Sequence, residues 1–92
     1  MEHFRKLGIV EHIIKTIEEQ GFEVPSEIQD KAIPLVLSGN DVIAGSATGS
    51  GKTLVFGAGI IQSCEKGNGL QALVLTPTRE LAQQITEALR KF

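Results

Sequence analysis

Apolar side chains recur at helical spacing near the N-terminus. Between residues 9 and 20 they form one face, made of Val10, Ile13, Ile14 and Ile17. This spacing predicts a helix with one buried side. Gly21 follows as a C′ residue that ends the helix.

A second helix is predicted from Glu27 to about Leu37. Ser26 precedes it as an N-cap, and Gln29 three residues later completes the pattern of a capping box. Pro34 lies inside this segment, so we expect the helix to be kinked or shortened there.

Two short apolar runs, residues 42–45 and 72–75, predict strands that are buried on both faces. Each run precedes a predicted helix, the first from Lys52 to about Glu65. The second helix opens at Thr76-Pro77, where proline suits the first turn. Two glycines at positions 57 and 59 lower the helix propensity of the first, so we expect close packing against a neighbour to support it.

The predicted order is helix, helix, strand, helix, strand, helix. Strands that alternate with helices indicate an α/β fold with a parallel sheet and right-handed crossovers. Two parallel strands do not make a stable sheet, so the sheet is expected to be incomplete and the chain to be a fragment. The exposed apolar edge of the second strand predicts non-native self-association.

Composition adds few constraints. A chain of 92 residues has room for one small domain, and its net charge of −2 means that any nucleic-acid contact must be local. A single cysteine, Cys64, excludes an internal disulfide and a cysteine-based zinc site. No apolar run reaches membrane-spanning length, so we expect no membrane partner and a cytoplasmic location.

A phosphate-binding loop is predicted between the first strand and the helix that follows it. Its residues are Ser46, Ala47, Thr48, Gly49, Ser50, Gly51, Lys52 and Thr53. Glycines let backbone N–H groups turn toward phosphate oxygens, and the helix N-terminus favours negative charge. Lys52 can reach the β- and γ-phosphates of ATP, and the Thr53 hydroxyl can bind Mg²⁺, which makes both catalytic candidates. The alternative is a glycine-rich turn that only links strand to helix.

Three segments together resemble the DEAD-box RNA helicases. Residues 21–29 resemble the Q motif of that family, and Phe4 resembles its isolated upstream aromatic residue. Residues 46–53 look like motif I, with serine where the family usually has alanine, and residues 77–82 match motif Ia. The resemblance covers essentially the whole chain. It implies that residues 1–92 are the N-terminal portion of a P-loop, RecA-like helicase domain.

The resemblance also implies the activity of the full-length protein. ATP hydrolysis would be coupled to RNA duplex unwinding, with ATP and Mg²⁺ as cofactors and with the remaining helicase domains as partners. The family's Asp-Glu-Ala-Asp motif does not occur here. We therefore expect this chain to bind nucleotide but not to turn it over.

Gln29 and Phe4 are candidates for adenine binding. The Gln29 amide offers a donor and an acceptor that match the adenine edge, and Phe4 could stack on the base. For Gln29 the alternative is a purely structural capping box, although both roles can coexist. For Phe4 it is a place in the hydrophobic core. Phe22 is expected to pack rather than to contact the base.

Motif Ia implies contact with the RNA backbone through Pro77, Thr78 and Arg79. A helix N-terminus and an arginine suit phosphate binding that is independent of base sequence. The alternative is a solvated first turn with Arg79 in a surface ion pair. Two other functional classes are alternatives: another P-loop NTPase, and a non-catalytic nucleotide-binding module that is complete at 92 residues.

Overall fold

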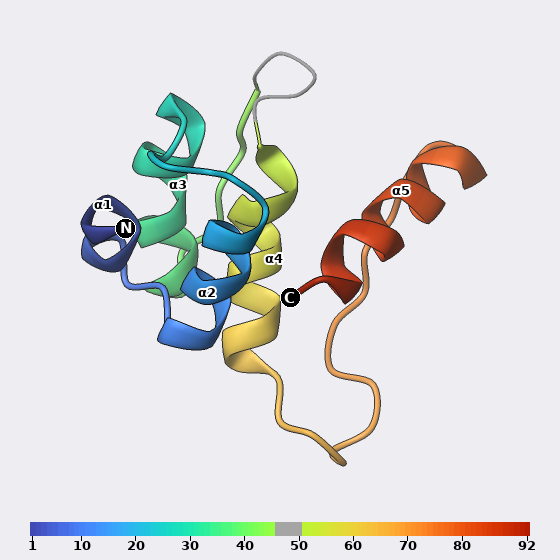
Figure 1. Cartoon of the computed structure of the whole chain (residues 1–92). Coiled ribbons are helices and arrows are strands. Elements are labelled where there is room, and N and C mark those ends of the chain that lie inside the picture. Colours follow the sequence, from blue (N-terminus) through green and yellow to red (C-terminus); the bar gives the residue numbers. More distant parts are fainter. Residues whose placement is uncertain (46–50) are drawn as a thin grey trace.

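The structure is a computed structural model that describes residues 1–45 and 51–92. These residues contain five α helices, namely α1 (Glu2–Lys6), α2 (Glu11–Glu19), α3 (Glu27–Leu37), α4 (Lys52–Ser63) and α5 (Arg79–Arg90). Figure 1 shows α1 to α4 gathered around one another, with α5 to one side at the end of a long connection.

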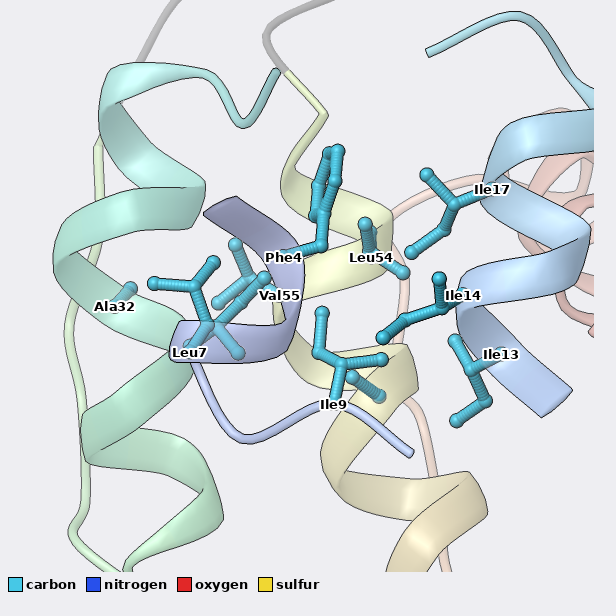
Figure 2. Packing of buried hydrophobic residues seen from close by; sticks show 11 residues of the cluster. Phe4, Leu7, Ile9, Ile13, Ile14, Ile17, Ala32, Leu54 and Val55 are labelled. Atoms are coloured by element: carbon cyan, nitrogen blue, oxygen red, sulfur yellow. The ribbon is translucent and has the colours of Figure 1, made fainter. Parts of the chain in front are cut away.

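The hydrophobic core lies between the first four helices. Its fully buried side chains include Phe4 of α1, Ile14 and Ile17 of α2, Ile33 of α3 and Ala58 of α4. Figure 2 shows Phe4 beside Leu54, with the isoleucines of α2 directed into the same space. The apolar stripe predicted for residues 9–20 is therefore the buried face of α2, except that Val10 is exposed.

The predicted end of α2 and the predicted start of α3 are confirmed, whereas α2 begins at Glu11, two residues after the start of the predicted segment. The Ser26 hydroxyl accepts a hydrogen bond from the Gln29 N–H, and the Gln29 side chain accepts one from the Ser26 N–H. Gly21 has φ of +86° and ends α2. The N–H groups of Gly21 and Phe22 return to the carbonyls of Glu18 and Ile17, which satisfies the last turn. Pro34 lies inside α3 without shortening it.

The predicted α/β sheet is wrong for the part of the chain that the structure describes. Residues 42–45 and 72–75 form no strand there, and Figure 1 draws both segments as plain traces. A strand requires a neighbour that pairs with its N–H and C=O groups, and no such ladder forms between these segments. Both runs were expected to be buried, yet Ile43 and Leu75 are exposed.

One whole helix, α1, and the start of α5 also differ from the prediction. Helix α1 was not predicted, because five residues are too few to show a periodicity. Helix α5 begins at Arg79 with Thr78 as its N-cap, so Pro77 precedes the helix instead of lying in its first turn. The Thr78 hydroxyl accepts the Leu81 N–H at 3.1 Å, and this cap sets the start.

The two glycines of α4 allow close approach on two sides, as the sequence predicted. A Cβ atom on Gly59 would lie 2.5 Å from Cγ1 of Val36 in α3. A Cβ atom on Gly57 would lie 2.6 Å from Cδ2 of Leu89 in α5. Helix α4 is thus the central element, packed against α3 on one side and α5 on another.

Within the described ranges, none of the helices is long and apolar enough to cross a membrane.

Candidate nucleotide-binding site

The first turn of α4 has the features of an anion-binding helix end. Its N-cap is Gly51, with φ of +88°, which has no side chain that could cap the N–H groups of the first turn. No acidic residue lies in this first turn, and Lys52 and Thr53 are its first two residues, both half-buried. The N–H groups of a helix N-terminus, the helix dipole and an ammonium group all favour a bound phosphate at such an end.

The remaining predicted loop residues, Ser46, Ala47, Thr48, Gly49 and Ser50, lie outside the described residues. The structure therefore describes only the end of the predicted phosphate loop, from Gly51 onward.

Gln29 connects the start of α3 to the start of α4. Its side chain is buried, with 3% exposed. The Oε1 atom accepts the Ser26 N–H at 2.9 Å, and the Nε2 atom donates to the Gly51 carbonyl oxygen at 3.2 Å. These two partners fix the orientation of the amide, because one is a donor and the other an acceptor. Gln29 thus lies directly beside the glycine that precedes Lys52.

The Gln29 amide retains hydrogen-bonding capacity after these contacts. A glutamine side chain has two N–H donors and two acceptor lone pairs, and the two contacts use one of each. The capping box, the alternative to adenine binding, is therefore present, and the Gln29 contacts with described residues leave one donor and one acceptor of the amide.

Phe4 is fully buried in the hydrophobic core. Its ring lies between α2 and the first turns of α4, beside Leu54 (Figure 2). The alternative for Phe4, a place in the hydrophobic core, is therefore the one that the structure shows. Its neighbour Leu54 lies two residues after Lys52, so Phe4 is close to the start of α4. Phe22, which was expected to pack, is instead about half exposed.

A cavity of about 270 Å³ adjoins the Lys52 side chain. Its other lining residues are apolar and come from α3, α4 and the segment before the phosphate loop: Val36, Val42, Ala44, Val55 and Phe56. The apolar stem of Lys52 can pack along such a surface while its charged end extends beyond it.

The predicted RNA-binding residues lie at the start of α5, away from the helices that surround Gln29 (Figure 1). The Thr78 hydroxyl is engaged as the N-cap acceptor, and the Thr76 hydroxyl donates to the Thr78 carbonyl oxygen at 2.8 Å. Arg79 is exposed and makes no salt bridge with any residue in the described ranges. The surface ion pair that was weighed as the alternative is therefore not formed among them.

Sequence reasoning missed the two polar contacts of one side chain at the opposite end of α4 from this site. Gln62, at the far end of α4, accepts the Val10 N–H at 2.9 Å and donates to the Gly8 carbonyl oxygen at 3.3 Å. Both partners are backbone groups more than 50 residues away in the sequence. No local pattern around Gln62 could have indicated them.

Comparison with known proteins identifies the family. A model of the DEAD/DEAH box helicase family matches residues 26–92. A "DEAD-box ATP-dependent RNA helicase RhpA" of Helicobacter pylori (strain B128) is 50% identical over 89 residues, which cover 97% of this chain and 18% of that protein. The "RNA helicase CrhR" of Synechocystis sp. is 48% identical over 89 residues, again covering 97% of this chain and 18% of that protein.

This chain therefore spans about 18% of the length of the curated relatives it matches. The match begins at the N-cap of α3 and includes Gln29, Gly51, Lys52, Thr53 and residues 77–79. These comparisons confirm the resemblance drawn from the three motifs, and the chain belongs to the DEAD/DEAH box helicase family.

Proposed function

We propose that this chain is the ATP-binding N-terminal segment of an ATP-dependent RNA helicase. In the complete protein, ATP hydrolysis would be coupled to unwinding of an RNA duplex with the help of the remaining helicase domains. The proposal rests on membership of the family and on the wording of the relatives' names. A cytoplasmic location is part of it.

The hydrogen bond between Gln29 and Gly51 is the observation that carries the nucleotide-binding role. It brings a buried amide against the N-terminus of α4, where Lys52 and Thr53 begin the helix. An adenine edge and a phosphate chain belong to one molecule, so their binding groups must lie close together. In this arrangement Gln29 would select adenine with its remaining donor and acceptor.

Lys52 and Thr53 would hold the phosphates and Mg²⁺. The ammonium neutralises phosphate charge, and the threonine hydroxyl is an oxygen ligand of the kind that Mg²⁺ accepts. Ser46 to Ser50 would supply further backbone N–H groups. Phe4 would support the base side of the site; its buried position favours packing beneath the site over direct stacking.

RNA binding through Pro77, Thr78 and Arg79 is the second part of the proposal. The exposed guanidinium of Arg79 and the N-terminus of α5 suit a phosphate of the RNA backbone. Such contacts position a strand without reading its bases.

Calorimetric titration with ADP–Mg²⁺ and with GDP–Mg²⁺ tests the nucleotide site. We expect ADP to bind more tightly than GDP. Replacing Lys52 (Lys52→Ala) should abolish binding of both, whereas Gln29→Ala should mainly reduce the preference for ADP. The matched controls are Lys66→Ala and Gln83→Ala, which remove an exposed ammonium and an exposed amide elsewhere.

Other outcomes would favour the competing functions. Equal affinity for ADP and GDP would favour another class of P-loop NTPase. The absence of nucleotide binding by a folded chain would contradict the proposal. Because the 92-residue sequence contains no Asp-Glu-Ala-Asp motif, we expect no ATP turnover, and measurable turnover would contradict that expectation.

A further inference from the structure

Helix α2 lacks a side-chain cap of its own. Its N-cap residue is Val10, whose side chain cannot accept a hydrogen bond. The third residue of the helix, Ile13, cannot accept the Val10 N–H as the glutamine of a capping box would. The local contact at this start is with α1: Arg5 donates to the carboxylate of Glu11, the first residue of α2, at 2.6 Å. This ion pair joins α2 to α1 and does not fix α2 on α4.

Gln62 of α4 supplies the missing half of this cap from a distance. Its Oε1 atom accepts the Val10 N–H at 2.9 Å, the same length as the bond from the Ser26 N–H to Gln29 within α3. Its Nε2 atom donates to the Gly8 carbonyl oxygen at 3.3 Å, so one amide holds both sides of the turn between α1 and α2.

A glutamine amide therefore links α4 to a neighbouring helix near each of its ends, to α3 at the start and to α2 at the end. Near its start, Gly51 accepts from Gln29, which begins α3. Near its end, Gln62 holds the start of α2. Between these two points the chain runs along α2, through the short segment 20–25, and into the Ser26–Gln29 cap. Segment 20–25 therefore joins the end of α2 to the cap that carries Gln29.

We propose that Gln62 is a positioning residue for the adenine side of the nucleotide site. Gln62 holds the turn between α1 and α2 against α4. It would thereby set the position of segment 20–25 at the end of α2, and the packing of Phe4 of α1 and Ile17 of α2 beneath the site. This inference rests on the nucleotide-binding function proposed above.

The phosphate side does not depend on Gln62. Lys52 and Thr53 begin α4, Gly51 is its N-cap, and Gln62 lies at the opposite end of that helix. At a rise of 1.5 Å per residue, the separation is roughly 15 Å along the helix axis. Loss of the Gln62 contacts should therefore loosen α2 without altering the first turn of α4.

Titration of Gln62→Ala with ADP–Mg²⁺, GDP–Mg²⁺ and inorganic tripolyphosphate tests the proposal. The affinity for ADP should fall about five- to tenfold, the ratio expected for one net hydrogen bond. The affinities for GDP and tripolyphosphate should stay within twofold of the wild-type values. Hydrogen exchange of the Val10 amide should accelerate, which reports the lost contact directly.

Gln62→Glu provides the conservative comparison. The carboxylate still accepts the Val10 N–H but cannot donate to the Gly8 carbonyl when it is ionised. It should keep slow exchange at Val10 and most of the ADP affinity, even if Gln62→Ala folds poorly. Gln83→Ala, on the exposed face of α5, should change neither measurement.

Two results would overturn the inference while leaving the proposed function intact. In the first, ADP and tripolyphosphate lose affinity equally, which would show a general effect on folding. In the second, exchange at Val10 accelerates but ADP binds as before, which would confine Gln62 to a structural role. If the wild-type chain does not bind ADP, the proposed function and this inference both fail.

Discussion

At the scale of single residues, Gln29 and Gly51 depend on each other. Gly51 has φ of +88°, and a Cβ atom there would lie 2.2 Å from Nε2 of Gln29. Glycine is therefore required twice, once for the backbone conformation and once for the approach of the amide. In the sequence, Gln29 and Gly51 belong to two separate motifs, and nothing there indicates that they are in contact.

Replacing Gly51 with alanine should destabilise the chain through both effects. The left-handed backbone costs about 1–2 kcal/mol for a residue with a Cβ atom. Displacement of the Gln29 amide removes a hydrogen bond worth about 1 kcal/mol. Urea unfolding of Gly51→Ala should therefore show a loss of about 2–3 kcal/mol, the sum of these two terms.

A double-mutant cycle separates the two effects. In the Gln29→Ala background the Cβ atom meets no amide, so Gly51→Ala should cost only its backbone part. Equal costs in both backgrounds would show that the contact between Gln29 and Gly51 contributes nothing.

At the scale of elements, the two helices packed against the glycines of α4 differ in how easily their contacting side chains can move. Gly59 faces Val36 of α3, and Gly57 faces Leu89 of α5. Valine is branched at Cβ and has little rotameric freedom, and α3 packs closely on α4. Leu89 instead presents the end of a longer side chain from a helix that buries none of its residues.

Gly59→Ala and Gly57→Ala form a matched pair. Each substitution gains up to about 1 kcal/mol of helix propensity. At Gly59 overpacking against Val36 costs about 1–3 kcal/mol, so the net effect should be destabilising. At Gly57 the Leu89 side chain can move aside, so the net effect should be near zero or stabilising. Thermal unfolding followed by circular dichroism compares them, and the reverse order would contradict this account of the packing.

At the scale of the whole molecule, the segment after α4 exposes apolar surface. Leu70, Leu73 and Leu75 are 89%, 75% and 84% exposed, and Ile43 in the earlier segment is also exposed. Exposed apolar residues that lie together favour association in water. We therefore expect the chain to self-associate as its concentration rises, although the described residues form no β-sheet with an exposed edge strand.

Light scattering across a concentration series tests this expectation. The double substitution Leu73→Lys with Leu75→Lys should keep the chain monomeric at concentrations where the wild type associates. Helical circular dichroism should not change, because neither residue belongs to the core. Leu35→Lys, at an exposed leucine of α3, is the control and should not prevent association. A wild-type chain that stays monomeric throughout would contradict the prediction.

The sequence by itself determined the features that depend on neighbours a few residues apart. The buried face of α2, the capping box of α3 and the glycine end of α2 each follow from side chains within about one or two helical turns. The three motifs that indicate the family are also local. The short helix α1 lies below the length at which such patterns appear.

Only the tertiary structure decided which distant groups meet. The runs at 42–45 and 72–75 have the composition of strands. A strand forms only when another backbone satisfies its hydrogen bonds, and none does so within residues 1–45 and 51–92. The contacts of Gln29 with Gly51 and of Gln62 with Gly8 and Val10 likewise join residues far apart in the chain. Amide side chains have no periodicity that would reveal such partners, so their pairing depends on how the helices pack.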